Sequence, residues 1–205
     1  MPADPNNGRH AVPVKCASCN GTLDTPLFCS SCRRLYPADG LNYYELLGLE
    51  PTYDVDVEDI RQKYFAVVRE IHPDRLVADS APTQRLSMRV SAQLNQAFQV
   101  LMDPVQRAEY LLELSGGKAA SDDKQVPQQV LIDTLELREE IEEAKAGEDQ
   151  ASLERLRAQI QQRFDQTLQD ICTLCRQLPG DEKLRQDLRG ELNAIRYLRK
   201  LLEQL

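Results

Sequence analysis

The chain has 205 residues, of which 41% are hydrophobic and 28% charged, with 4 Phe, 7 Tyr and no Trp; this allows one or two helix-rich domains with hydrophobic cores. Its formal net charge of -8 argues against a general nucleic-acid binder, because neutralising phosphates requires a basic surface. No segment approaches the run of about 20 apolar residues that a membrane-spanning helix needs.

The N-terminal residues, Met1 to Arg9, contain Pro, Asp, Asn and Gly but no apolar core, so they do not form a secretory signal. They do not form an Arg-rich amphipathic helix either. We therefore expect a cytoplasmic protein, or a protein of the mitochondrial matrix if a transit peptide was removed before this numbering.

Two C-x-x-C pairs follow, separated by a segment that contains Gly21: Cys16, Cys19, Cys29 and Cys32. This spacing predicts one structural Zn²⁺ held by four thiolates in a closed tetrahedral site. Small and polar residues dominate the segment, so the metal would supply its folding energy. Two disulfides are an alternative, opposed by a reducing cytoplasm. Four thiolates can also hold an iron–sulfur centre.

The middle of the chain carries the signals of four helices. Asn42 can cap a short helix over residues 43–47 that Gly48 ends, and Asp56 can cap a long one. Asp103-Pro104 then opens a fourth helix over residues 105–114. The long second and third helices are predicted by apolar residues at helical spacing: Val57, Ile60, Tyr64, Val67, Val68 and Ile71, then Leu86, Val90, Leu94, Ala97 and Leu101.

Between these two long helices lies His72-Pro73-Asp74, which interrupts the helix because proline restricts the residue before it. The result is a helical hairpin with the tripeptide at its tip. This hairpin resembles the J-domain, whose loop triggers ATP hydrolysis in a DnaK-type chaperone. On the preceding helix, three cations are candidates for contact with an acidic chaperone surface: Arg61, Lys63 and Arg69.

A small, polar linker follows, and three further helical stretches are predicted over residues 127–146, 149–177 and 181–205. Amphipathic helices with short connections predict an antiparallel three-helix bundle. Cys172 and Cys175 have the spacing of another metal hook. However, Cys175 lies on the apolar stripe of its helix and no further ligands are left nearby, so we expect it in the core.

One face of the first bundle helix is predicted to point away from the core. At about 100° per residue, Val130, Thr134, Leu137, Ile141 and Ala144 share the core side. The opposite side is a candidate protein-binding patch of apolar and acidic residues: Leu131, Ile132, Leu135, Glu136, Glu139 and Glu143. An imprecise helix phase or contact with the J-like region are the alternatives.

In the last helix, Tyr197 lies nearly opposite the inward stripe of Leu184, Leu188, Ile195, Leu198 and Leu202. An outward aromatic residue is a common interface anchor. An isolated surface tyrosine is the alternative reading.

From Cys16 onward the chain resembles the HscB family of iron–sulfur co-chaperones, in the form that carries an N-terminal tetracysteine zinc domain. It has neither the Gly/Phe-rich segment nor the downstream cysteine hooks of an ordinary DnaJ. The resemblance rests on Tyr43-Tyr44-Glu45-Leu46-Leu47-Gly48-Leu49, His72-Pro73-Asp74-Arg75, Ser91-Ala92-x-x-Asn95-x-Ala97, Asp103-Pro104-x-x-Arg107-Ala108-x-Tyr110-Leu111-Leu112 and Leu131-Ile132-x-x-Leu135-Glu136-Leu137-Arg138-Glu139-Glu140.

The resemblance implies a mainly α protein with a zinc module (residues 1–40), a J-domain (41–116), a linker (117–126) and a three-helix scaffold-binding bundle (127–205). It implies that the J-domain stimulates a DnaK/HscA-type ATPase. The bundle would bind an IscU-type scaffold through Leu131, Ile132, Leu135, Glu136, Glu139, Glu143 and Tyr197. Ile132 stands where Met is common and Tyr197 where Phe is common, and both keep apolar bulk.

We expect no enzymatic activity of the chain itself, since it contains only two histidines and no phosphate loop or catalytic triad. The oligomeric state is left open. A zinc or redox protein that uses the N-terminal cysteines, with an accessory J-domain, is the alternative function.

Overall fold

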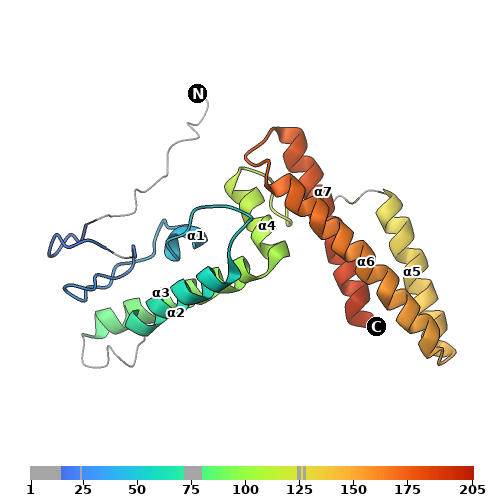
Figure 1. Cartoon of the computed structure of the whole chain (residues 1–205), viewed down its shortest axis with the longest axis horizontal. Coiled ribbons are helices and arrows are strands. Elements are labelled where there is room, and N and C mark those ends of the chain that lie inside the picture. The colour runs from blue at the N-terminus through green and yellow to red at the C-terminus, as the bar shows by residue number, and fades with distance from the viewer. Residues whose placement is uncertain (1–14, 24, 72–79, 124–125, 127) are drawn as a thin grey trace. The chain divides into compact units, whose positions relative to one another are not determined.

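The computed structural model describes residues 15–23, 25–71, 80–123, 126 and 128–205, and the predicted His72-Pro73-Asp74 tip lies outside them. The described chain is mainly helical, as predicted (Figure 1). Its helices are α1 (Tyr43–Leu46), α2 (Val57–Ile71), α3 (Ala81–Met102), α4 (Pro104–Leu114), α5 (Gln128–Ala146), α6 (Gln150–Cys175) and α7 (Glu182–Gln204).

The chain forms two compact units, Met1–Asp103 and Pro104–Leu205, which are described separately. The predicted J-domain, residues 41–116, spans the point where these units divide. None of the described helices combines the length and hydropathy needed to cross a bilayer.

In the first unit, α1 begins with a capping box. The Asn42 side chain accepts a hydrogen bond from the Glu45 backbone N–H at 3.0 Å, and the Glu45 carboxylate accepts one from the Asn42 N–H at 2.8 Å. Gly48 follows with a φ of +63°, a conformation that glycine adopts without steric strain. These local signals stop the helix after one turn.

Helices α2 and α3 form the predicted hairpin, and α1 packs against α3. The hairpin buries Ile60, Val67 and Ile71 of α2 together with Val90, Leu94, Ala97 and Leu101 of α3. The Tyr64 and Phe98 rings stack at 4.1 Å, and the Tyr64 hydroxyl donates to Asn95 Oδ1 at 2.8 Å. At the other end, the buried Ser87 hydroxyl donates to the Ile71 carbonyl at 2.6 Å and ties the last residue of α2 to α3.

The segment before α1 is built from loops that three isolated antiparallel bridges connect: Lys15 with Thr22, Thr25 with Phe28, and Phe28 with Leu35. Its small core contains Leu27, Phe28, Leu35 and Ala38 besides two cysteines. A core of this size contributes little hydrophobic stabilisation, which agrees with a segment that depends on another source of folding energy.

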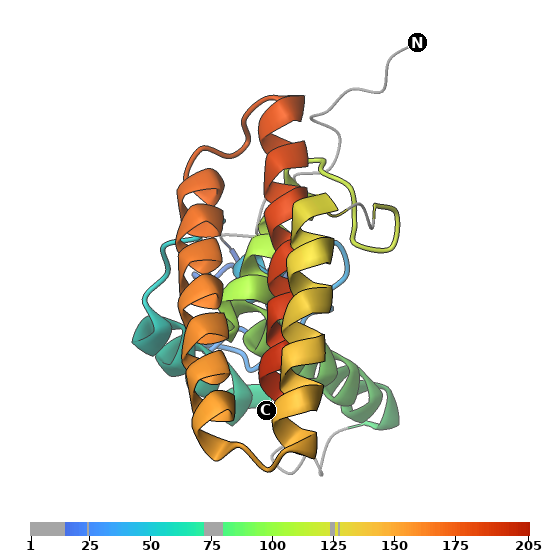
Figure 2. The same cartoon turned by 90° about the vertical axis from the view of Figure 1, so that its right-hand side faces the viewer.

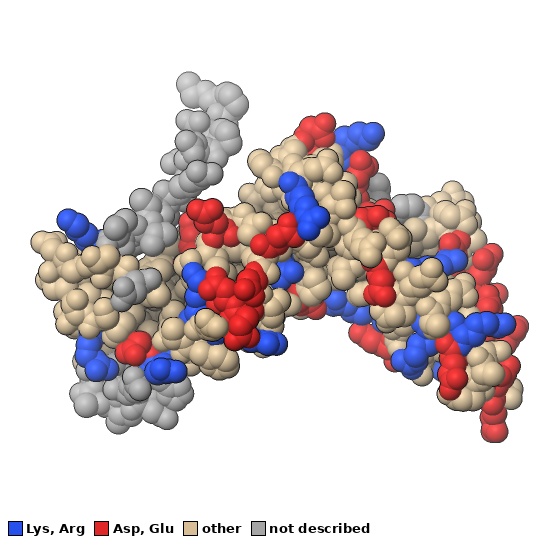
Figure 3. Space-filling model, in the orientation of Figure 1, with Lys and Arg blue, Asp and Glu red and all other residues tan. Residues whose placement is uncertain are grey.

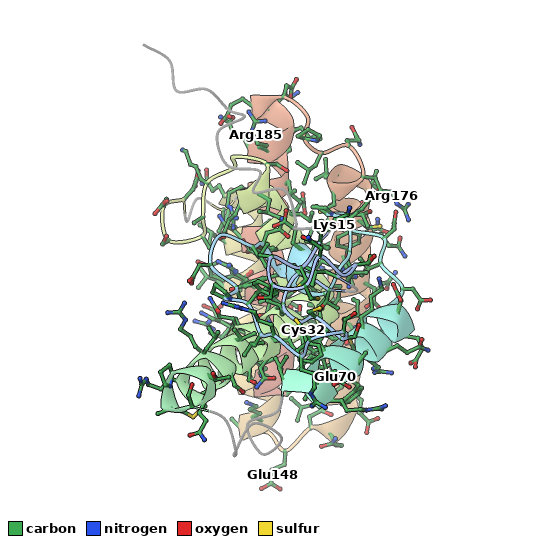
Figure 4. All side chains as sticks on the ribbon, turned by 90° about the vertical axis from the view of Figure 1, so that its left-hand side faces the viewer. Lys15, Cys32, Glu70, Glu148, Arg176 and Arg185 are labelled. Carbon is green, nitrogen blue, oxygen red and sulfur yellow. The ribbon has the colours of Figure 1, made fainter. Side chains whose placement is uncertain are left out.

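In the second unit, α5, α6 and α7 lie side by side, with α6 running opposite to the other two (Figure 2). Leu137 and Ile141 of α5 pack with Leu156, Ile160, Leu198 and Leu201 in one core cluster. Asp149 and Asp181 cap α6 and α7 by accepting backbone hydrogen bonds from Ser152 and Leu184. Glu148 occupies the turn between α5 and α6 with a φ of +52° (Figure 4).

Helix α4 packs against α6 and α7 and buries Val105, Ala108, Leu111 and Leu112. A buried ion pair joins Glu109 to Arg189 of α7 at 2.6 Å, and Arg196 approaches the other Glu109 oxygen at the same distance. No local sequence pattern predicts this contact, because Glu109 and Arg189 belong to segments far apart in the chain. It fixes α4 to the C-terminal helices.

Candidate functional site

The two N-terminal C-x-x-C hooks have the same backbone geometry. The N–H groups of Cys16 and Cys29 donate to the carbonyls of Gly21 and Arg34, at 2.8 and 3.0 Å. Asn20 and Arg33, one residue after each second cysteine, adopt φ values of +54° and +59°. Residues other than glycine rarely adopt this backbone conformation. Its occurrence at the same position in both hooks indicates that the turn after each second cysteine requires it.

This backbone brings the four sulfur atoms within 4.8 Å of one another. Cys16 and Cys32 are 3.5 Å apart, and Cys19 and Cys29 are 3.6 Å apart. A disulfide needs about 2.05 Å, and the four thiols are free. A tetrahedral metal with bonds of about 2.3 Å spaces its sulfur ligands by about 3.8 Å. The cluster is therefore compatible with one metal ion, and Figure 4 places Cys32 among the N-terminal loops.

Tyr36 is the side-chain neighbour of this cluster that sequence reasoning missed. Its hydroxyl lies 3.0 Å from Cys16 Sγ and accepts a hydrogen bond from the Ala17 N–H at 3.0 Å. The Tyr36 hydrogen bond is the main reason that the pKa of Cys16 falls to about 6, and the same bond raises the pKa of Tyr36. The proton therefore stays on the phenol, which donates to a thiolate.

Cys32, which is exposed whereas Cys16 is buried, has a pKa shifted in the opposite direction. The Arg34 backbone N–H lowers the pKa of Cys32, but hydrogen bonds with neighbouring sulfurs, Cys16 first, and desolvation raise it to about 12. Metal binding displaces such protons, because the thiolate is the ligand.

In the part of the chain that the structure describes, the second cysteine pair does not belong to a cluster of metal ligands. Cys175 is buried on α6 and Cys172 is half-buried. Among the described residues, only the N-terminal cysteines gather at least three side chains able to hold a metal. The prediction that Cys175 belongs to the core is confirmed.

The predicted chaperone-binding residues on α2 have different surroundings. Arg61 and Arg69 are exposed, and Arg61 lies 3.7 Å from Glu58. Lys63 donates to the Gly48 carbonyl at 3.0 Å and lies 3.8 Å from Asp59, so it also holds the segment after α1. Phe65, which sequence reasoning passed over, is 57% exposed one helical turn from both arginines.

The predicted binding face of α5 is exposed as its helical phase requires. Leu131, Ile132 and Leu135 are 39%, 40% and 58% exposed, whereas Leu137 is 3% exposed. Glu136, Glu139 and Glu143 are exposed beside them. Figure 3 shows acidic side chains gathered along α5. We call Leu131, Ile132, Leu135 and these three glutamates the α5 face.

Tyr197 is half-buried rather than turned fully outward. It lines a cavity of about 360 Å³ on α7, together with Asn193 and the aliphatic residues Ala120 and Val126. The helical period predicted the side of α7 on which Tyr197 lies. It could not predict that the linker residues Ala120 and Val126 lie beside it, because they belong to a separate segment. Three cations around this cavity were also missed, although all of them lie within three residues of Tyr197 in the sequence: Arg196, Arg199 and Lys200.

Comparison with known proteins gives two domain matches. Residues 42–110 match the family model of the DnaJ domain. Residues 126–205 match that of the HSCB C-terminal oligomerisation domain. Neither match includes the tetracysteine segment.

Two curated relatives are named co-chaperone protein HscB homologs. The protein of Shewanella halifaxensis is 33% identical over 168 residues, which cover 80% of this chain and 95% of the relative. The protein of Shewanella pealeana is 32% identical with the same coverage.

The fold is similar to two solved structures. The human co-chaperone protein HscB covers 92% of this chain and 95% of its own, with a TM-score of 0.77 and 23% identity. The chaperone HscB from Vibrio cholerae covers 80% and 94%, with a TM-score of 0.67 and 27% identity. Together with the sequence matches, these comparisons show that the chain belongs to the HscB co-chaperone family.

Proposed function

We propose that this protein is a co-chaperone of iron–sulfur cluster biogenesis. Its J-domain stimulates ATP hydrolysis by a DnaK/HscA-type chaperone, and its C-terminal bundle binds an IscU-type scaffold protein and delivers it for cluster transfer. The observation that carries the proposal is the α5 face: Leu131, Ile132 and Leu135 remain exposed on a helix whose other side is well packed. Exposed apolar residues set among carboxylates are typical of a protein-binding surface.

The proposed mechanism needs no covalent chemistry on this chain. Contact of His72, Pro73 and Asp74 with the chaperone favours the conformation that hydrolyses ATP, which is a ligand-driven shift of population. The exposed Arg61 and Arg69 on α2 complement an acidic chaperone surface. Because the scaffold is carried on the same chain, its effective concentration at the chaperone rises.

The test is the steady-state ATPase rate of a DnaK/HscA-type chaperone with and without this protein. The unmodified chain should raise the rate, and His72→Gln should remove the stimulation while leaving scaffold binding unchanged. Equal stimulation by both forms would contradict the role given to His72. Absence of stimulation by the unmodified chain would contradict the proposed function.

We further propose that Cys16, Cys19, Cys29 and Cys32 hold one structural Zn²⁺. A set of four thiolates leaves no open coordination position, and zinc prefers this donor set and geometry. When bound, zinc cross-links the two hooks and supplies folding energy. Elemental analysis of protein purified under reducing conditions should give about one zinc per chain. Iron with labile sulfide, or no metal, would contradict the assignment.

A further inference from the structure

The cavity on α7 is positively charged, although the chain as a whole carries a net charge of -8. Arg196, Arg199 and Lys200 line it together with one carboxylate, Glu203, and Arg196 is also paired with Glu109 of α4. The remaining lining includes the Tyr197 ring and the aliphatic Val126. A cavity of about 360 Å³ with cationic and apolar walls has the chemistry to receive a carboxylate side chain and an apolar neighbour.

The three cations are held to different degrees. Arg196 approaches Glu109 of α4 at 2.6 Å, and Arg199 lies over the Phe164 ring at 6.0 Å. These contacts fix the two guanidinium groups in place before a ligand arrives, which reduces the entropy lost on binding. Lys200 is exposed on the same side of α7 as Arg196, one helical turn further. Arg196 is exposed as well, but Lys200 forms no ion pair among the described residues.

We propose that this cavity is the docking site of an acidic segment of the scaffold protein, whose carboxylates contact Lys200 and Arg196 while an adjacent apolar side chain packs on Tyr197. The inference rests on the proposed scaffold-binding function and extends it. Tyr197 connects the cavity with the predicted scaffold-binding surface, because it belongs to both.

A scaffold held at both the α5 face and the α7 cavity would carry a defined pattern of surface charge. The α5 face is acidic and the α7 cavity is basic. A scaffold that contacts both must present a basic area to α5 and an acidic segment to α7. Opposite charges at the two ends of an interface permit one orientation and penalise the reverse, so this arrangement fixes how the scaffold is held.

The experiment is isothermal titration of the full-length chain with an IscU-type scaffold protein. Lys200→Glu is compared with Lys183→Glu, an exposed lysine at the start of the same helix and outside the cavity. At about 0.1 M salt, we expect Lys200→Glu to weaken binding by about fivefold or more and Lys183→Glu by less than about twofold. At about 1 M salt, where the screening length falls to about 3 Å, the two variants should converge. Thermal melts check that both are folded.

Leu135→Ala, on the α5 face, separates this inference from the proposed function. If Leu135→Ala weakens scaffold binding but Lys200→Glu behaves like Lys183→Glu, the cavity is not part of the interface and the inference is wrong. If the unmodified chain does not bind the scaffold, the proposed function and the inference both fail.

A second copy of this chain could compete with the scaffold for the α7 cavity, because its acidic α5 face would complement the cations that line the cavity. Light scattering over a range of protein concentrations tests it. A dimer that Lys200→Glu dissociates, with unchanged scaffold affinity of the variant, would assign the cavity to self-association and overturn the inference.

Discussion

At the residue scale, Tyr36 is a neighbour of the cysteine cluster that would support the proposed zinc site without being one of its ligands. Its hydroxyl lies 3.0 Å from Cys16 Sγ, and the Ala17 N–H donates to its oxygen. The ring is therefore fixed while the hydroxyl donates to the sulfur. Groups that hydrogen-bond to a metal ligand orient it and tune its basicity, and their removal typically weakens metal binding by about 10- to 100-fold.

We expect Tyr36→Phe to weaken zinc binding by about tenfold or more, because the Cys16 thiolate loses its hydrogen-bond donor. Competition with a chromophoric chelator measures the affinity. Tyr43→Phe is the matched control, since Tyr43 lies on α1 rather than beside the sulfur atoms. Equal affinities of the two variants would show that Tyr36 has no part in metal binding.

Gly190, in the interior of α7, is a second position where a single residue affects the free energy of unfolding. A Cβ built at this glycine has no neighbouring atom within 4 Å. Gly190→Ala should therefore raise the free energy of unfolding by about 0.5–1 kcal/mol, because alanine loses less backbone entropy in a helix. Urea denaturation should show a higher midpoint with an unchanged slope.

Gly117 is the control for that substitution. A Cβ there would lie 2.9 Å from the Leu112 carbonyl oxygen, so Gly117→Ala should lower the midpoint. A loss of stability in Gly190→Ala would mean that the outer surface of α7 contacts something at this position.

At the scale of the element, one side of α5 packs in the bundle core and the other side is exposed, where we propose that the scaffold binds. Leu137 is 3% exposed within the bundle core, and Leu135, two residues earlier, is 58% exposed. Truncating a buried leucine removes packing contacts and leaves a cavity, so it destabilises the fold. Truncating an exposed leucine does neither and changes the stability little.

Leu137→Ala should lower the free energy of unfolding by about 2–5 kcal/mol. Leu135→Ala should leave it almost unchanged but weaken scaffold binding by about 2 kcal/mol, as expected for an interface anchor. Thermal melts paired with titration of an IscU-type scaffold measure both quantities. A comparable loss of stability in both variants would mean that the inner and outer faces of α5 are wrongly assigned.

The start of α6 has a pH-dependent cap. The Ser152 hydroxyl and backbone N–H both donate to the Asp149 carboxylate, and these bonds lower its pKa. Because the folded-state pKa lies below the unfolded value of about 3.9, the carboxylate stabilises the folded state above that pH. The contribution disappears as the pH falls through the folded-state pKa.

Asp149→Asn keeps a capping oxygen but removes the charge. We expect the variant to melt below the unmodified chain at neutral pH. The difference should shrink below the unfolded pKa of about 3.9 and vanish once the pH has fallen through the lowered folded-state pKa of Asp149. Circular dichroism at 222 nm follows the helical signal. A difference that does not depend on pH would exclude the charge of Asp149 as its source.

At the scale of the whole molecule, the chain divides into compact units between Asp103 and Pro104, so α4 belongs with the C-terminal helices. The Glu109 and Arg189 side chains at this contact are 12% and 4% exposed. Their atoms approach closely, yet none of the Glu109 oxygens or Arg189 nitrogens meets hydrogen-bond geometry. The attraction within the pair therefore only partly offsets the free energy that desolvating the two charges costs.

Removal of one partner should be strongly destabilising. Glu109→Ala leaves the buried Arg189 without its carboxylate partner and should lower the free energy of unfolding by about 3–5 kcal/mol. Replacing the pair by Glu109→Leu and Arg189→Met together should change it by about 1 kcal/mol or less. Hydrogen exchange of the α4 amides, with chemical denaturation, is the measurement. An equal loss in the single and double variants would contradict this account.

Much of the secondary structure could be predicted because its causes are local. The Asn42, Asp149 and Asp181 caps each act on a residue three positions away. The two sides of α5 follow from the 3.6-residue period of the helix. The C-x-x-C hooks likewise depend on hydrogen bonds within six residues. Such interactions are already specified by neighbouring residues, so the sequence by itself determined the helices, the exposed α5 residues and the two cysteine hooks.

Only the tertiary structure decided the contacts between distant segments. Tyr36 meets Cys16 across the module, Glu109 meets Arg189 between α4 and α7, and Tyr197 lines a cavity with Val126. No periodicity relates these residues, because their separation in space is set by how the elements pack. The assignment of α4 to the C-terminal unit has the same origin: its apolar face and Glu109 find partners on α6 and α7, which no pattern within residues 104–114 specifies.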